Sequence, residues 1–193
     1  MAKVYTGIFN EREWKYFEEE FNHVFNSDDS FAFLAQCKEW LQNAPGGLTE
    51  DTGVAYPGGL LHHIVIQLFY AKKLRDLIKN DIDIPIESVI KVCILMHLSK
   101  AEMFVPNDND WELKKGKLYK FAELEGKLKF GDRSILMCMN NGIRLTPSEF
   151  EAMKCLDNSN DDNFQKLFSS PLSTIIRIAN ELSYMVERAR VAK

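Results

Sequence analysis

The chain has 193 residues, of which 46% are hydrophobic and 27% are charged, and its formal net charge is -4. This balance is typical of a globular protein and excludes a disordered or low-complexity chain. The net charge gives no general electrostatic reason to bind nucleic acid, so only a local basic patch would do so. The length suits one core. We therefore expect a single domain over residues 1–193.

Nothing in the sequence indicates export, a membrane span or a disulfide framework. The first residues lack the apolar stretch of a signal peptide, and no segment approaches the roughly 20 apolar residues that cross a bilayer. The cysteines stand far apart without a C-x-x-C pair, which favours reduced thiols in the core. They are Cys37, Cys93, Cys138 and Cys155. We expect a cytoplasmic protein that does not engage membranes.

Aromatic and apolar residues recur every three or four positions in the first 43 residues, which predicts two helices. Asn10 can cap the first, which runs from residue 11 to about 26. The second begins at the cap signal of residues 28–30 and ends near Asn43, before Pro45-Gly46-Gly47. The first helix is aromatic on one side, so we expect it to cover the core, with a homodimer face as the alternative.

Two longer apolar segments predict the centre of the domain. Residues 60 to about 78 and residues 86–98 carry apolar side chains on nearly every face, as helices buried among others do. The sequence Pro57-Gly58-Gly59 leads directly into the first, which predicts a sharp entrance. A short connection at residues 81–85 joins the two helices.

The next segment lacks helical periodicity. Trp111 and Leu113 alternate with polar residues before a Lys-Lys-Gly-Lys turn at Gly116, and Tyr119 and Phe121 do so after it. This alternation predicts a small β-hairpin that turns near Gly116.

Helical patterns then resume to the end of the chain. One helix is predicted from Asp132 to about Asn140, and a second follows Thr146, which can cap it. The last runs from about Leu172 to Arg190. Its predicted core stripe is Leu172, Ile175, Ile176, Ala179, Leu182, Val186 and Ala189.

Three short segments carry a resemblance to a known family. Residues 57–63 (Pro-Gly-Gly-Leu-Leu-His-His) open the first buried helix, residues 96–101 (Met-His-Leu-Ser-Lys-Ala) close the second, and residues 131–134 (Gly-Asp-Arg-Ser) begin a later one. In this order they resemble a branch of the HD-domain phosphohydrolase superfamily, often met in bacteria, phages and mobile elements. The resemblance implies a mainly α-helical, HD-domain-like bundle of about 30–190 with a small β-hairpin insertion, on which helix 10–26 packs.

The resemblance also implies a set of metal ligands, which this chain has in part. In the superfamily, two His and two Asp in the order H…HD…D bind divalent metals that activate a water for attack on phosphorus. His63 corresponds to the first ligand. At the His-Asp pair this chain has Met96-His97, so either His97 stands at the Asp position or the Asp is missing. Asn180 stands in place of the last Asp, and an amide brings no charge.

At two further positions this chain also lacks a His that is common in the branch. Phe130 stands where a His is frequent, and Leu156 lies where a second His is often found. We therefore predict a catalytically degenerate protein in which His63 is a buried, hydrogen-bonded histidine. The alternative is a divergent phosphohydrolase acting on nucleotides or phosphodiesters, with His63 and His97 as ligands of Mn, Mg, Ni or Fe.

Five other residues suggest a binding site that needs no metal. Backbone N–H groups at the helix start by Gly58 and Gly59, together with Lys100, Arg133 and Ser134, can hold a phosphate. We accordingly predict binding of a nucleotide or another phosphate-containing ligand, or of a protein partner. The plain alternative is that Lys100 and Arg133 form surface ion pairs.

Two further alternatives concern macromolecular partners. A phage-type structural or inhibitory interaction protein would need neither metal nor ligand. The basic stretch around the predicted hairpin is interleaved with aromatic residues, as on nucleic-acid surfaces, but three glutamates interrupt it. We therefore favour a solvated hairpin over nucleic-acid binding.

Overall fold

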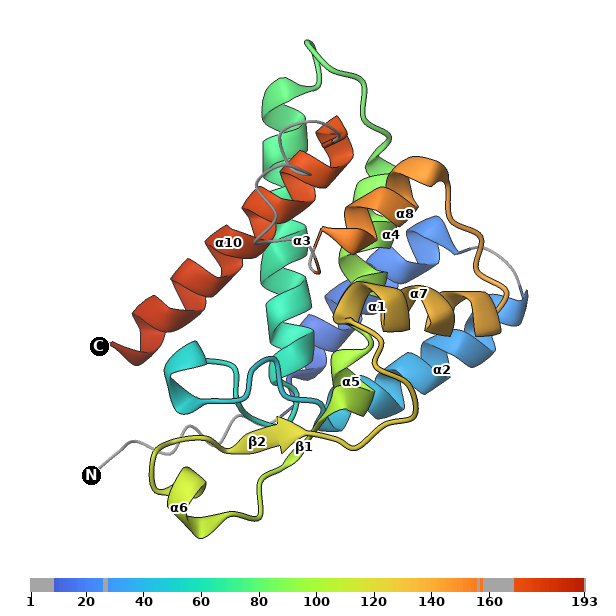
Figure 1. The fold of residues 1–193 in the computed structure, drawn as a ribbon. Coiled ribbons are helices and arrows are strands. Elements are labelled where there is room, and N and C mark those ends of the chain that lie inside the picture. Colours follow the sequence, from blue (N-terminus) through green and yellow to red (C-terminus); the bar gives the residue numbers. More distant parts are fainter. Residues whose placement is uncertain (1–8, 26–27, 156, 158–168, 193) are drawn as a thin grey trace.

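A computed structural model describes residues 9–25, 28–155, 157 and 169–192. The fold is mainly α-helical with one small antiparallel pair of strands, which confirms the expected class (Figure 1). Within these residues, no helix is long and apolar enough to cross a membrane. All four cysteines are free thiols, and three of them are buried.

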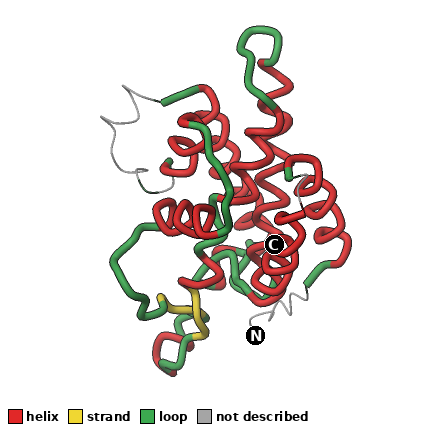
Figure 2. Tube along the Cα trace, turned by 90° about the vertical axis from the view of Figure 1, so that its right-hand side faces the viewer, coloured by secondary structure: helices red, strands yellow, loops and turns green. Residues whose placement is uncertain are grey.

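The elements agree closely with the periodicity of the sequence. They are α1 (Glu11–Val24), α2 (Asp28–Asn43), η1 (Glu50–Thr52), α3 (Gly59–Ile78), α4 (Ile86–Leu95), α5 (Lys100–Met103), β1 (Phe104–Pro106), α6 (Asp110–Leu113), β2 (Tyr119–Phe121), α7 (Phe130–Asn140), α8 (Pro147–Lys154) and α10 (Pro171–Val191). Figure 2 shows the two strands at one end of the helical body and the loop after α3 at the other.

Helix α3 is the centre of the molecule, with α10, α4, α1 and α2 packed around it (Figure 1). Its start is as sharp as predicted. Gly58 adopts a left-handed conformation with φ of 86°. A Cβ atom on Gly59 would lie 2.0 Å from the carbonyl oxygen of Val54, so only glycine fits there.

Helix α1 covers the core, as its aromatic side predicted. The Asn10 side chain caps it by accepting hydrogen bonds from two backbone N–H groups of its first turn. Trp14, Phe17 and Phe21 are buried, and the helix packs on α4 and α3. This burial ties the N-terminal helix to the helices at the centre of the molecule.

The predicted hairpin is correct in its second strand and wrong in its first. Strand β2 pairs with β1, with Phe104 opposite Phe121, so the first strand lies before Trp111. Trp111 instead belongs to the short helix α6 and its side chain is 64% exposed. The reason is local, because Asn109 accepts hydrogen bonds from the first N–H groups of α6 and nucleates a helical turn.

The predicted core stripe of α10 is correct in its first half and wrong in its second. Leu172, Ile175, Ile176 and Ala179 are buried. Beyond them the buried residues are Ser183 and Glu187, whereas Ala189 is exposed and two predicted core residues are only partly buried, Leu182 and Val186. The buried face changes because Glu187 has a polar partner inside the core, His63.

Candidate functional site

His63, His97 and Asn180, which the sequence singles out, meet in the centre of the molecule. Helix α3 turns His63 inward, and the turn that follows α4 places His97 beside it. The two imidazole rings are 4.6 Å apart between centroids, and both residues are fully buried. The Oδ1 atom of Asn180, from α10, lies 3.1 Å from Nε2 of His63. We call these three residues and their hydrogen-bonded neighbours the buried cluster.

His63 uses both of its ring nitrogens inside the protein. Nε2 faces Asn180, and Nδ1 lies 2.8 Å from Oε1 of Glu187. The His63 and Glu187 side chains are both 0% exposed. Tyr184 covers the ring, with 4.6 Å between the two centroids. His63 is therefore a hydrogen-bonded core histidine with no nitrogen free for a ligand.

His97 has a different arrangement, with one partner and one unpartnered nitrogen. Its Nε2 lies 3.0 Å from Oε1 of Gln67, and the Gln67 amide nitrogen donates to the sulfur of Met96 at 3.2 Å. The Nδ1 atom of His97 is buried without a hydrogen-bond partner. Since Oε1 of Gln67 accepts, the ring proton belongs on Nε2 and the Nδ1 lone pair remains unused.

Lys100 supplies a positive charge beside the two histidines. It is only 4% exposed, and its Nζ donates to the Gly46 carbonyl and to the Tyr184 hydroxyl, at 3.3 and 3.0 Å. Burial lowers the pKa of His63, and the ammonium of Lys100 lowers it further. The same two causes, joined by His63, bring the pKa of His97 well below its usual value. Both rings are therefore neutral near pH 7.

The buried cluster does not fit the divalent metal that the resemblance implies. Its donors toward the centre are two neutral imidazoles and an amide, and Glu187 binds the far nitrogen of His63. A lysine ammonium nearby opposes a cation. Among the residues that the structure describes, no three His, Cys, Asp or Glu side chains are arranged to hold a metal ion.

The acidic residues that might complete an unusual site are engaged elsewhere. Asp132 and Asp157 both pair with Lys154, at 2.5 and 3.1 Å. Phe130 packs on Phe104, with 5.7 Å between their ring centroids, and so belongs to the aromatic cover of the strands. Leu156 lies outside the described residues.

The start of α3 offers few free N–H groups to a phosphate. The Gly59 N–H donates to the Tyr56 carbonyl at 2.9 Å, and the Leu60 N–H donates to the Ala44 carbonyl at 3.1 Å. Gly59 is also buried, beneath the loop that contains Gly46. Two of the N–H groups that a helix start usually presents to an anion are therefore already in use.

The side chains expected to join Gly58 and Gly59 in holding a phosphate also have internal partners. Arg133 donates to the Glu125 carbonyl at 2.9 Å and pairs with Glu102 at 3.7 Å. The Ser134 hydroxyl is buried and donates to the Met96 carbonyl at 2.9 Å. At Arg133 an ion pair forms, but the Arg133 side chain in it is only 11% exposed. At Lys100 that alternative is wrong, because its ammonium is buried on neutral oxygens.

The basic stretch near the strands is partly neutralised by its own acidic neighbours. Lys117 pairs with Glu112 at 2.8 Å, and Lys120 pairs with Asp108 at 2.6 Å. The Lys115 ammonium lies over the exposed Trp111 ring, 3.3 Å from its centroid. These contacts favour the solvated surface expected from the interrupting acidic residues.

Sequence reasoning missed several members of the buried cluster, although a pattern was present. Gln67 follows His63 by four residues in an otherwise apolar helix, so both lie on one face. Asn180, Tyr184 and Glu187 follow one another by four and three residues on α10. Two polar stripes at helical spacing on facing buried helices predict a polar contact between them.

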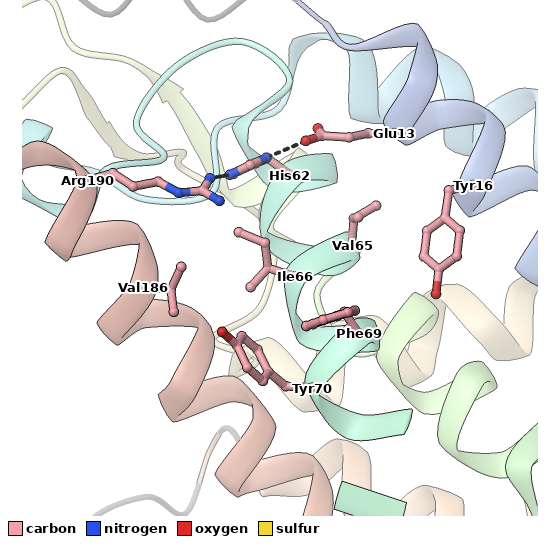
Figure 3. Close-up of a pocket in the computed structure, with 9 residues that line it drawn as sticks. All are labelled: Glu13, Tyr16, His62, Val65, Ile66, Phe69, Tyr70, Val186 and Arg190. Atoms are coloured by element: carbon pink, nitrogen blue, oxygen red, sulfur yellow. Dashed lines mark hydrogen bonds and ion pairs between the residues drawn. The ribbon is translucent and has the colours of Figure 1, made fainter. Parts of the chain in front are cut away.

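The outer face of α3 carries a surface groove that the sequence did not predict (Figure 3). It lies where α1, α3 and α10 adjoin, and its volume is about 380 Å³. His62 stands at its polar end, between Glu13 and Arg190. Adjacent residues of a helix point about 100° apart, so His62 faces outward while His63 faces the core.

Comparisons with models of known protein families, with curated proteins and with solved structures found no match to this chain.

Proposed function

We propose that this protein is a catalytically inactive HD-like domain that acts by binding a ligand or a protein partner. The cytoplasmic location expected from the sequence is part of this proposal. The main observation in support is that His63 is fully buried and that its two ring nitrogens are hydrogen-bonded to Glu187 and Asn180. A metal ligand needs a free lone pair directed at an open site, and His63 has none.

The chemistry of the buried cluster supports the same proposal. A hydrolytic metal centre needs negative ligands to hold the ions and a path for water and substrate. In the buried cluster the two histidines and Asn180 are neutral, and Lys100 adds a positive charge. The two histidines have no exposed surface. The cluster is suited to joining α3, α4 and α10 through buried hydrogen bonds.

A phosphate-containing ligand and a protein partner both remain candidates for the bound species. The five residues expected to hold phosphate are Gly58, Gly59, Lys100, Arg133 and Ser134. The Lys100 ammonium, the Ser134 hydroxyl, a terminal N–H group of Arg133 and the Gly59 N–H are hydrogen-bonded within the protein, whereas Nε of Arg133 has no partner. Binding at that place would require several internal hydrogen bonds to break, so we favour binding elsewhere on the surface.

The second candidate is a divergent metal-dependent phosphohydrolase. One observation favours it, namely that His63, His97 and Asn180 meet as the superfamily pattern requires, with Nδ1 of His97 unpartnered. An active site would require the Asn180 amide to leave Nε2 of His63 and a carboxylate from elsewhere to approach.

Metal analysis and enzyme assays separate the two candidates. Purified protein is analysed for bound metal and tested on phosphomonoesters, phosphodiesters and nucleotides with Mn, Mg, Ni or Fe. We expect less than stoichiometric metal and the same background rate for the native protein and for His63→Gln. Stoichiometric metal with turnover that His63→Gln abolishes and His62→Gln retains would establish the phosphohydrolase instead.

Thermal denaturation with added nucleotides tests the binding half of the proposal. A ligand present at 100 times its Kd stabilises the folded protein by about 2.7 kcal/mol, which is readily measured as a higher Tm. A protein partner would be sought by the same shift with candidate partners. A structural or inhibitory interaction protein would show no shift with any small ligand.

A further inference from the structure

The surface groove at α1, α3 and α10 combines an apolar body with a polar end (Figure 3). Its walls include Ile66 and Phe69 from α3 and Val186 from α10. The Phe69 side chain is 47% exposed, so the groove opens to solvent. Pockets that bind small ligands usually measure about 300–1,000 Å³ and have mostly apolar walls with a few polar groups. This groove, of about 380 Å³, lies at the small end of that range.

The polar end is a chain of three side chains from three helices. Glu13 of α1 lies 2.6 Å from Nδ1 of His62, and an N–H of Arg190 donates to Nε2 of the same ring. Because Nε2 accepts, the ring proton is on Nδ1 and is donated to the carboxylate. His62 thereby fixes the position of the exposed guanidinium at the mouth of the groove.

Arg190 has hydrogen-bonding capacity beyond this contact. A guanidinium carries five N–H donors. In the described part of the chain, the Arg190 side chain makes one hydrogen bond, to His62, and no ion pair with a carboxylate. Its remaining donors are available to an anion that lies over the apolar walls.

The charges at this end determine the class of anion. Arg190 is one cation, and the Glu13 carboxylate lies on the other side of the His62 ring. A monocarboxylate brings one negative charge to Arg190, whereas a phosphate dianion brings two and is repelled more strongly by the Glu13 carboxylate. We propose that the groove binds a small organic monocarboxylate whose apolar or aromatic body lies between α3 and α10 and whose carboxylate binds Arg190.

This site goes beyond the proposed function, because it is separate from the buried cluster. His63 and Glu187 face inward from the same two helices whose outer residues line the groove. Loss of groove binding would leave the assignment of the buried cluster unchanged. Hydrolytic turnover would likewise leave the groove binding measurable.

The test titrates isotope-labelled protein with 4-phenylbutyrate and follows backbone amide shifts by NMR. The neutral 4-phenylbutanamide has the same body without the charge, and AMP offers an aromatic body with a phosphate. We expect shifts at α3 and α10, with the carboxylate binding at least about tenfold more tightly than the amide, since charge-assisted hydrogen bonds are the stronger ones. AMP is expected to bind more weakly than 4-phenylbutyrate.

Two variants and a matched control locate the site. Arg190→Gln removes the preference for the carboxylate, and Val186→Trp fills the groove and abolishes binding. Arg188→Gln lies on the same exposed turn of α10 outside the groove, so it binds as the native protein does. Unchanged circular dichroism and Tm show that each variant folds.

Four outcomes would overturn the proposal. One is equal affinity for the acid and its amide, and another is unchanged affinity in Arg190→Gln. The third is the absence of any shift at about 10 mM ligand, which is above even weak millimolar affinities. Shifts with a short peptide ending in Phe, but not with free carboxylates, would likewise overturn it in favour of a protein C-terminus.

Discussion

His63 and Glu187 form a pair that is completely enclosed by the protein, with 2.8 Å between Nδ1 and Oε1. On its other side, His63 faces the Oδ1 atom of Asn180 at 3.1 Å. A neutral imidazole has one N–H, so it cannot donate to two acceptors. Burial lowers the pKa of His63. The neutral ring therefore donates from one nitrogen and accepts at the other, so its two partners have opposite hydrogen-bonding roles.

Removing one member of this pair should destabilise the protein strongly. His63→Ala leaves the buried Glu187 carboxylate without its partner, and the Oε2 atom of that group already has none. We expect a loss of about 3–5 kcal/mol in the free energy of unfolding, measured by urea denaturation. Glu187→Gln keeps the shape and one hydrogen bond, so its loss should be smaller.

Glu181→Gln is the matched control for this pair. Glu181 lies on the same helix, its side chain is 63% exposed, and it pairs with Arg177 at the surface. The expected change is below about 1 kcal/mol, as for other surface pairs. If His63→Ala were as mild as this control, the buried pair would not contribute to stability.

The two buried histidines should make stability depend on pH in the weakly acidic range. Their folded pKa values lie below the ordinary 6.5, so below that pH the unfolded chain binds more protons than the folded one. Stability therefore falls as the pH drops through about 6.5. The slope is up to about 1.4 kcal/mol per pH unit for each histidine, and it continues down to the folded pKa. Urea titrations between pH 7.5 and 5 measure it.

Variants of single histidines show which residue causes the pH dependence of the unfolding free energy. His97→Gln should reduce the pH dependence by about half, because one of the two depressed groups is gone. His23 is exposed near the end of α1, so His23→Gln should leave the slope unchanged. A protein equally stable at pH 7.5 and 5.5 would contradict the burial of neutral rings.

Lys100→Met tests the electrostatic role of the buried ammonium. Without that charge, the pKa values of His63 and His97 should both rise, because Lys100 lowers each of them. An NMR titration of the ring protons measures this shift. Folding stability should fall by about 1–3 kcal/mol, since the Gly46 carbonyl loses its buried donor.

The control for Lys100 is Lys79→Met, at the exposed end of α3, where the lysine pairs with Asp76 at 3.7 Å. It should leave both histidine pKa values in place. Identical titrations for the two variants would show that the Lys100 charge does not act on the rings.

The N-terminal cap of α8 gives a local test of the fold. Thr146 accepts from the Glu149 N–H at 3.3 Å, and Glu149 accepts from the Thr146 N–H at 2.9 Å. Thr146→Ala should cost about 1 kcal/mol of unfolding free energy by urea denaturation. Ser148→Ala, exposed in the same turn, should cost less than half as much. Equal costs would mean that the cap does not stabilise the helix.

Local sequence signals, such as helix caps and hydrophobic periodicity, determined most of the secondary structure. Asn10 and Thr146 cap helices as expected, and α3 starts as sharply as Pro57-Gly58-Gly59 predicted, with Gly58 in a left-handed conformation. The failure at Trp111 has the same local origin, because the cap at Asn109 outweighed an alternating pattern of only a few residues.

The sequence by itself determined the helices and brought His63, His97 and Asn180 forward as one set. Only the tertiary structure decided what they do. His63 and Glu187 are 124 residues apart in the sequence, and no local pattern predicts that they form a hydrogen bond with each other. Caps and periodicity act over a few residues, whereas the partner of a buried polar group depends on how helices dock. That docking buried Glu187, in the second half of α10, against His63, enclosed the two histidines, and left His62 and Arg190 on the outside at the groove.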